Sequence, residues 1–216
     1  MRPIIFIILF TIASKLYSQA DSVAYSRDFI LNEGLYLTYW DFRHNWPIPK
    51  EKILTKINKD QLDFYGKLIE EDKIEYIERD GNNSTIKSEK VWGFCQNNVI
   101  YLNINKSFFR IPVFGTISYF LASVDVTIYS PGYNVFINGP PVGSTRTNVK
   151  EIREFLMDFY TGKIVEYNLT NLEEMLKKDS EIYFEFDALS KKKKKDQANR
   201  FIRKYNEKHP VYFPKN

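Results

Sequence analysis

The stretch "VIYLNIN", residues 99–105, alternates between apolar and polar side chains from Ile100 onward. Ile100, Leu102 and Ile104 fall on one side of an extended chain, and the tyrosine and the asparagines fall on the other. A period of two with one apolar face is typical of a half-buried strand in an antiparallel sheet. This stretch therefore predicts a β-sheet that lays one face on a core.

The same alternation recurs in "VDVTIYS", residues 124–130, where Val124, Val126 and Ile128 form the apolar side. The chain between the two stretches is rich in aromatic and β-branched residues and is interrupted by a glycine. No segment there is long enough for the helix that a parallel crossover requires. Residues 62–129 are therefore predicted to form a meander of short antiparallel strands.

Turn residues place two hairpins in the chain. Asp80-Gly81 separates two strand-like runs, which is a strong hairpin signal. Thr161-Gly162 predicts a second turn within "FLMDFYTGKIVEYN", although the apolar residues before it would also suit a helix: Val149, Ile152, Leu156 and Phe159. Residues 130–148 are expected to form a loop with at most one short strand, with turn chemistry around Gly139 and Gly143.

Capping signals predict helices on both sides of this β-rich region. Thr38 with Asp41 three residues later resembles a capping box, so we expect a short helical turn through Asn45. Thr170 and Glu173 form the same pattern at the start of a C-terminal helix. A further helix follows, with three apolar residues on one side: Ile182, Phe186 and Leu189.

The last predicted helix begins with five consecutive lysines, the lysine run: Lys191, Lys192, Lys193, Lys194 and Lys195. Farther along, four residues have the spacing of a core-facing stripe: Ala198, Phe201, Ile202 and Tyr205. We expect the second half of this helix to pack on the body and the lysine run to stand clear of it in water. The alternative is a weak contact of the run with an anionic surface.

Together these elements predict an α+β fold, an antiparallel, meandering and curled sheet from about residue 34 to 167 with two or three C-terminal helices packed on it. Residues 21–167 are expected to form a β-rich antiparallel domain. Residues 168–216 form a helical segment that packs on the same domain.

The N-terminus has the features of a secretory signal peptide. Arg2 precedes the apolar run "PIIFIILFTIA", and small residues precede a cleavage site after Ala20, with Gln19 as the near alternative. A membrane anchor is less suited, because the run is about half of the roughly 20 residues that a spanning helix needs. Residues 1–20 are therefore expected to be removed, leaving a secreted or periplasmic protein without a transmembrane segment. Cys95 is the one cysteine, so no internal disulfide can form, and a buried thiol is expected.

The net charge of +4 includes contributions from two regions with opposite charge. Residues 187–216 carry ten basic against three acidic side chains, which leaves residues 21–186 with a net charge of −5. The protein is therefore an acidic body with a basic tail. A nucleic-acid role is not expected, because the protein is exported and the lysine run lacks interleaved aromatic residues.

Few residues offer a recognisable chemistry. The chain has two histidines, and neither falls in a metal-ligand pattern, so no metal and no cofactor are expected. Asp41 and His44 would share a side of a helical turn and form half of a catalytic triad, but no serine in a nucleophile-elbow setting completes it. Paired carboxylates of a glycosidase stay open, because acidic residues are scattered through the chain.

An aromatic group offers the candidate binding residues Tyr39, Trp40 and Trp46. Exposed aromatic rings on a secreted protein can stack on sugar rings or anchor a partner protein. The alternative is that alternate members of the group, which also includes Tyr36 and Phe42, line the core.

Three strings resemble an uncharacterised family of exported proteins from Bacteroidota-type bacteria: "GLYLTYWDF" with a following "PIP", "VWGFC" before "VIYLNI", and "RKYNEKHPVYFP". The resemblance covers most of the chain after the signal peptide. It implies a bacterial cell-envelope or secreted setting, and it implies no catalytic residue.

The function expected from the sequence is that of an exported, non-enzymatic protein of the cell envelope or the extracellular space. Its partner would be an unknown protein or a saccharide. The alternative is a hydrolase acting on an envelope or extracellular polymer, and a third possibility is an adaptor that docks on anionic surfaces through the lysine run. The first two differ in whether a pocket gathers titratable side chains.

Overall fold

The computed structural model describes residues 22–131 and 144–215. The predicted α+β class is confirmed, with twelve strands in antiparallel sheets and the last three helices at the C-terminal end of this described chain. The strands are distributed over four sheets, and these do not close into a barrel. The predicted signal peptide and most of the predicted loop at residues 130–148 lie outside the described residues.

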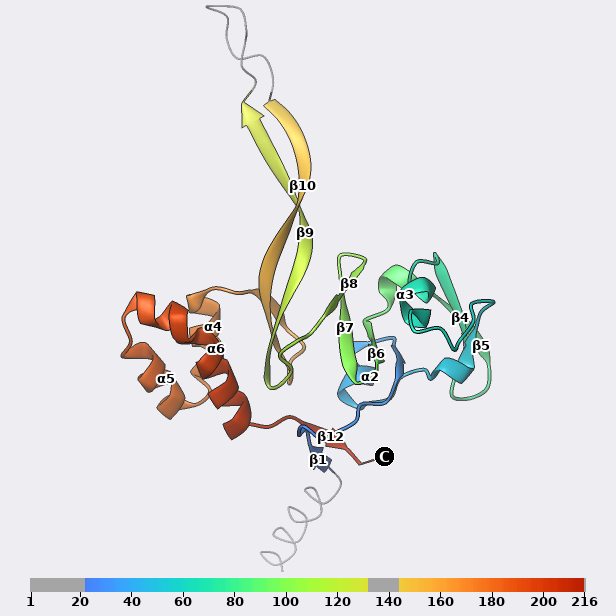
Figure 1. Ribbon diagram of the computed structural model, residues 1–216, viewed down its shortest axis with the longest axis horizontal. Helices are drawn as coiled ribbons and strands as arrows, with labels where there is room; N and C mark the ends of the chain where they lie inside the picture. The colour runs from blue at the N-terminus through green and yellow to red at the C-terminus, as the bar shows by residue number, and fades with distance from the viewer. Residues whose placement is uncertain (1–21, 132–143, 216) are drawn as a thin grey trace, which may run out of the picture.

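A long hairpin stands between the C-terminal helices and the other sheets (Figure 1). Its strands are β9, Ile117–Pro131, and β10, Ser144–Asp158, which pair without interruption from one end to the other. A short strand, β11, Ile164–Glu166, then pairs with the end of β10. The predicted turn at Thr161-Gly162 is confirmed, and the alternative of a helix before it is wrong, because this segment is the second half of β10.

The base of the hairpin is buried on both faces. On one face, Phe120, Ala122 and Met157 join the core beneath the largest sheet. On the other face, Ile117 and Leu156 join a core made by the C-terminal helices. Figure 1 shows the same arrangement, with the helices on one side of the hairpin and the remaining strands on the other. The upper part of the hairpin extends beyond both layers.

The largest sheet has four strands in the order β2, β6, β7 and β8. These strands are Gly34–Tyr36, Gly93–Gln96, Val99–Ile104 and Ser107–Arg110. Ile100 and Leu102 are buried and Ile104 is partly buried, so the strand predicted from the alternation at residues 99–105 is confirmed. Ile128 of the second alternating stretch is instead 42% exposed, because it lies on the part of the hairpin that no layer covers.

A smaller sheet contains β3, Ile53–Leu54, β4, Lys73–Ile77, and β5, Asn83–Lys87. It packs with the short helix α3, Phe64–Leu68, around a core of its own. The strands β4 and β5 form the hairpin predicted at Asp80-Gly81, and Gly81 adopts the left-handed φ of 91° that such a tight turn favours in glycine. Two single turns of 3-10 helix, Lys50–Lys52 and Ser88–Lys90, flank this sheet.

Three helices follow the hairpin: α4, Leu169–Leu176, α5, Ser180–Asp187, and α6, Lys191–Lys208. The N-cap of α4 is Asn168, whose side-chain oxygen accepts a hydrogen bond from Asn171 N at 2.8 Å. The predicted cap at Thr170 is therefore wrong, since the helix begins one residue before it. The predicted stripe of α6 is confirmed by four buried residues: Ala198, Phe201, Ile202 and Tyr205.

The lysine run forms the first turns of α6, as predicted, but it does not stand entirely clear of the body. The side chain of Lys194 is 12% exposed and lies 2.8 Å from both Glu173 and Asp187. Its ammonium group also lies over the ring of Phe186. Acidic side chains of the preceding helices thus supply partners for one lysine of the run, and the other four are exposed.

The two ends of the described chain lie together. The strand β1, Ser22–Ala24, pairs with β12, Tyr212–Pro214, in an antiparallel sheet. Among the helices of residues 22–131 and 144–215, none is both long and apolar enough to cross a membrane.

Candidate functional site

The short helix α2, Tyr39–Arg43, positions the predicted aromatic group. The predicted capping box is confirmed: Thr38 Oγ1 accepts from Asp41 N at 3.2 Å, and Asp41 Oδ2 accepts from Thr38 N at 2.9 Å. This reciprocal cap satisfies two amide groups at the start of the helix. It therefore fixes the directions in which the following side chains project.

Trp40, His44 and Trp46 project from this segment and form an exposed aromatic surface. Trp40 is 52% exposed and Trp46 is 40% exposed. The imidazole of His44 lies 4.0 Å from the Trp40 ring and 5.5 Å from the Trp46 ring, centroid to centroid. The two indoles meet at 67° with their centroids 5.4 Å apart. The three rings thus make a continuous surface with a corner between the indoles.

Asn45 determines the course of the chain between His44 and Trp46. It is buried and adopts a left-handed φ of 53°, a conformation that asparagine tolerates better than most residues. Its side-chain oxygen accepts hydrogen bonds from Asn32 N and from Tyr36 Oη, both at 2.9 Å. These buried contacts fix the backbone conformation at Asn45. The next residue, Trp46, is thereby placed at the surface.

Arg79, at the end of the β4–β5 hairpin, completes the surface. Its Nη2 donates to the carbonyl oxygen of Trp46 at 3.1 Å, and its guanidinium carbon lies 4.7 Å from the centre of the Trp46 ring. The same guanidinium lies 3.6 Å from Asp41 Oδ1. A planar cation against an indole face is a favourable arrangement. Arg79 therefore supports Trp46 from one side.

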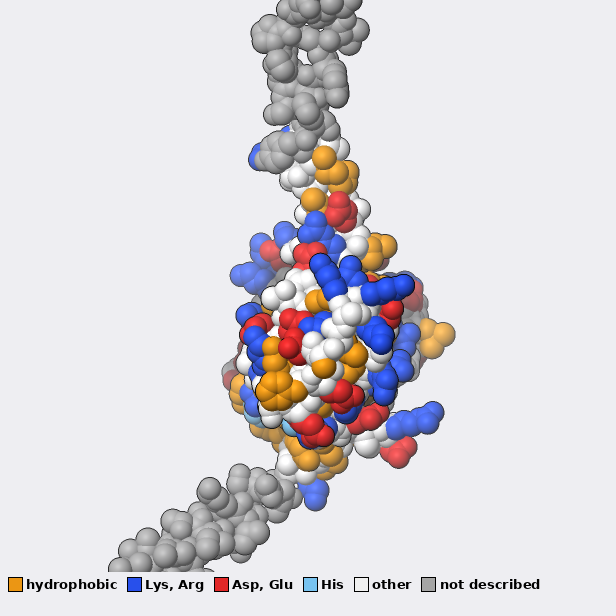
Figure 2. All heavy atoms as spheres, turned by 90° about the vertical axis from the view of Figure 1, so that its left-hand side faces the viewer, with side chains coloured by type: hydrophobic (Ala, Val, Ile, Leu, Met, Phe, Trp, Pro, Cys, Tyr) orange, Lys and Arg blue, Asp and Glu red, His pale blue; other side chains and the backbone are white. Residues whose placement is uncertain are grey.

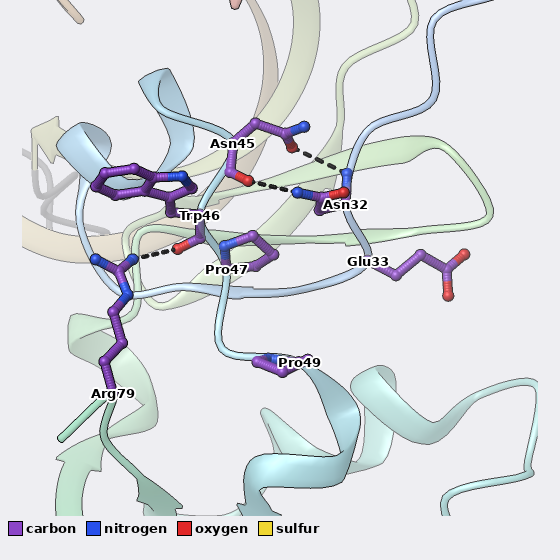
Figure 3. Close-up of a pocket in the computed structure, with 7 residues that line it drawn as sticks. All are labelled: Asn32, Glu33, Asn45, Trp46, Pro47, Pro49 and Arg79. Carbon is purple, nitrogen blue, oxygen red and sulfur yellow. Dashed lines mark hydrogen bonds between the residues drawn. The ribbon is translucent and has the colours of Figure 1, made fainter. Parts of the chain in front are cut away.

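An open hollow of about 570 Å³ adjoins Trp46 (Figure 3). Its walls combine apolar rings with polar groups: Trp46, Pro47, Pro49, Asn32, Glu33, Asn45 and Arg79. Figure 3 shows Trp46 and Arg79 at one end and Glu33 at the other. Such a combination of apolar surface and a few polar groups is typical of sites for small organic molecules.

The structure separates Tyr39 from the other two predicted binding residues. Tyr39 is half-buried, with its ring 5.8 Å from that of Trp92 and 6.4 Å from that of Phe42. Burial raises the pKa of the Tyr39 phenol to about 12. Its neighbours Tyr36 and Phe42 are fully buried, so the group divides between the core and the surface. The structure brings only Trp40 and Trp46 together.

Two members of the surface were missed in the sequence. Local spacing pairs His44 with Asp41 rather than with the aromatic rings, although its position between Trp40 and Trp46 in the chain is a usable signal. Arg79 is 33 residues from Trp46 in the chain, and no local pattern predicts their contact.

The arrangement around His44 does not form half of a catalytic triad. His44 Nδ1 lies 2.7 Å from the carbonyl oxygen of Trp40, and Asp41 is engaged with Thr38 and Arg79. Asp41 also lines a second hollow with Glu78 and Asp80. Hydrogen bonds from Asn82 lower the pKa of Asp80, the opposite of the raised pKa that the general acid of a glycosidase has.

His209 ends α6, and its Nε2 lies 2.6 Å from Asp179 Oδ2. Within residues 22–131 and 144–215, no three side chains of the metal-ligating types lie close enough together to hold an ion.

Comparison with known proteins gives no assignment. No protein-family model, no curated protein and no solved structure matches the chain. The resemblance to exported proteins of Bacteroidota-type bacteria therefore stays a prediction from three sequence strings.

Proposed function

We propose that the protein is an exported, non-enzymatic protein of the cell envelope or extracellular space that binds a saccharide through the aromatic surface of Trp40, His44 and Trp46. The observation that carries this proposal is the pair of exposed indoles, 52% and 40% accessible, held at a fixed angle by a helix cap and a buried asparagine. Export is supported by the sequence of residues 1–20.

The chemistry of the surface suits a sugar ring. A pyranose has apolar C–H faces, which pack on aromatic rings, and hydroxyl groups around its edge, which need polar partners. The indoles supply the first kind of contact, and the polar groups of the adjoining hollow supply the second: Asn32, Glu33 and Arg79. Arg79 also holds the Trp46 ring in place, so less conformational entropy is lost when a ligand binds there.

The rings are more exposed than a purely structural role requires. Large aromatic side chains are mostly buried, and burial of an aromatic ring contributes strongly to stability. Trp40 and Trp46 are only partly buried, so they contribute less to stability than Phe42, which is fully buried in the same segment. Exposed tryptophans held together at one place are typical of the central residues of a binding site.

A direct test is the titration of the protein with neutral oligosaccharides of β-glucan, xylan and mannan and with peptidoglycan fragments, followed by tryptophan fluorescence and calorimetry. We expect one of these probes to bind and Trp40→Ala to weaken that binding by at least about tenfold, the loss that removal of 1.4 kcal/mol of contact produces. Trp46→Ala should have a similar effect.

The matched control is Phe184→Ala, which removes an aromatic ring that is 67% exposed on α5 and far along the chain from the aromatic surface. This variant should bind as the unchanged protein does. Equal weakening by Phe184→Ala and Trp40→Ala, or no binding to any probe by the folded protein, would overturn the saccharide assignment. Intact-mass analysis tests export separately, since the native protein should begin between Gln19 and Asp21.

A further inference from the structure

A second cavity lies on the helical side of the molecule, away from the aromatic surface. It has a volume of about 610 Å³ and opens between the base of the β9–β10 hairpin, the connection from β11 to α4 and the N-terminal half of α6. Six of its lining residues carry the argument: Tyr119, Glu154, Tyr167, Lys191, Lys195 and Asn199. Its size is in the range of sites for small organic ligands.

The α6 wall of the cavity is cationic. Lys191 and Lys195 are four residues apart, so they project from the same side of the helix, and Asn199 continues that side one turn farther on. Neither lysine forms an ion pair with any residue that the structure describes, in contrast to Lys194, which contacts Glu173 and Asp187. Two lysine side chains without a partner thus line one wall.

The position of these lysines at the start of a helix is unfavourable for the helix itself. The N-terminal end of a helix carries partial positive charge, and cationic side chains are stabilising at the other end. The first turn of α6 contains no acidic side chain that would offset this. Figure 2 shows the helical side of the molecule, where basic side chains gather toward the hairpin with acidic ones among them. An anion in the cavity would relieve this accumulation of charge.

The opposite walls carry aromatic rings and one carboxylate. Tyr119 of β9 and Glu154 of β10 project from the same face of the hairpin, as their pairing with Leu156 and Leu121 requires. The rings of Tyr119 and Tyr167 meet edge to face with centroids 6.0 Å apart. Glu154 is exposed and lies close enough to Tyr119 to contribute, after burial, to raising the pKa of that phenol to about 12.

We propose that this cavity binds an acidic sugar, a pyranose that carries a carboxylate. The carboxylate would accept hydrogen bonds from Lys191 and Lys195, and the ring would pack on Tyr119 and Tyr167. Glu154 accepts hydroxyl hydrogens and disfavours a second negative charge near the tyrosines, so a ligand with one anionic group and several hydroxyl groups fits better than a polyanion. The proposal uses none of the residues of the aromatic surface and does not depend on the function proposed for that surface.

The test is calorimetric titration of the full protein with the methyl glycosides of galacturonic and glucuronic acid, each of which carries one carboxylate, at low salt. The methyl ester of each sugar keeps the ring and removes the charge, and inorganic phosphate supplies the charge without a ring. We expect the acid form to bind and both controls to bind at least about tenfold more weakly. The methyl ester loses the charge-assisted hydrogen bonds, and phosphate loses the ring packing.

Two double variants of the same helix separate the cavity from general charge. Lys191→Gln with Lys195→Gln should weaken binding by at least about tenfold, whereas Lys192→Gln with Lys193→Gln removes the same charge outside the cavity and should leave it within about twofold. If both double variants weaken binding equally, the sugar is attracted to the lysine run as a whole, and the proposed site is wrong. Phosphate binding as tight as that of the acidic sugar would reject the sugar, and absence of binding by the acid forms would reject the proposal altogether.

Discussion

His209 at the end of α6 lies 2.6 Å, Nε2 to Oδ2, from Asp179, the N-cap of α5. The same carboxylate lies 2.8 Å from the ammonium group of Lys208, and its other oxygen accepts from Ile182 N at 3.1 Å. One acidic side chain therefore caps the start of one helix and receives two basic side chains from the end of the next. The hydrogen bond from Lys208, followed by those from Ile182 and His209, holds the pKa of Asp179 well below its usual range.

Asp179→Asn should destabilise the protein at neutral pH by a larger amount than in acid. Asparagine is as good an N-cap as aspartate, so the variant loses the charge and keeps the cap. A carboxyl group with a lowered folded-state pKa contributes stability above its unfolded pKa of about 3.9, and this contribution is lost as the pH falls toward the folded-state pKa. Thermal unfolding should therefore be measured for both proteins from pH 7 to pH 3. The melting temperature of Asp179→Asn should lie below that of the unchanged protein at pH 7, and the gap between the two melting temperatures should narrow below about pH 4.

The control for this experiment is Asp196→Asn, which changes an exposed aspartate on α6 that forms no ion pair with the described residues. Its melting temperature should follow that of the unchanged protein at every pH. If the melting temperatures of Asp179→Asn and the unchanged protein instead differ by the same amount at every pH, the charge on Asp179 contributes nothing to stability.

Phe201→Ala should destabilise the protein by about 3–5 kcal/mol, the usual cost of removing a buried aromatic ring. Phe201 is 2% exposed and packs edge to face on Phe186, with centroids 4.9 Å apart. The adjacent Arg200 is exposed, so Arg200→Ala should stay within about 0.5 kcal/mol of the unchanged protein. Urea unfolding of both variants measures the two effects, and similar values would contradict the packing of α6.

Local patterns predicted most of the elements. Four of these patterns depend only on residues that are close in the chain: the alternation at residues 99–105, the Asp80-Gly81 turn, the Thr38 capping box and the stripe of α6. The first of these predicted a strand whose apolar residues Ile100 and Leu102 are buried. The same alternation failed at Ile128, because it does not report how far a hairpin extends beyond the layers that cover it.

Contacts between distant segments could not be predicted in the same way. The ammonium of Lys194 contacts Glu173 and Asp187 from other helices, so a run of five identical residues divides into one paired and four exposed members. The cap of α4 was misplaced because both Asn168 and Thr170 are good capping residues and the sequence offers no rule for choosing between them. At the aromatic surface, the division between buried Phe42 and exposed Trp40 depends on which side of α2 meets the core.

Cys95 should resist thiol reagents as long as the protein is folded. Burial raises the pKa of its thiol to about 12, with Glu33 adding to the effect, so the neutral form dominates at pH 8 and the reactive thiolate is scarce. Native protein should react with a disulfide reagent only at the rate at which the structure opens, and protein unfolded in guanidinium should react fully. A cysteine introduced by Asp196→Cys serves as the exposed reference, and equally fast labelling of Cys95 in the folded protein would contradict its burial.

Asn206 joins α6 to the beginning of β9 and offers the sharpest test of how the helices are attached to the hairpin. Its Nδ2 donates to the carbonyl oxygen of Ile117 and its Oδ1 accepts from Ile117 N, both at 2.8 Å. Ile117 is 2% exposed, so Asn206→Ala should leave two backbone groups without partners, at about 1–3 kcal/mol for each. Asn199→Ala changes an exposed asparagine of the same helix and should cost within about 0.5 kcal/mol.

Gly115 packs directly against the Asn206 amide, and a double-mutant cycle can measure this contact. A Cβ at position 115 would lie 2.4 Å from the side-chain atoms of Asn206, so Gly115→Ala should force that amide away from Ile117 and destabilise the protein. In the Asn206→Ala background the obstructing atoms are absent, and Gly115→Ala should cost much less. Residues in contact typically show coupling energies of about 0.5–3 kcal/mol. If urea unfolding instead gives additive effects for the two substitutions, the amide of Asn206 does not occupy the space beside Gly115.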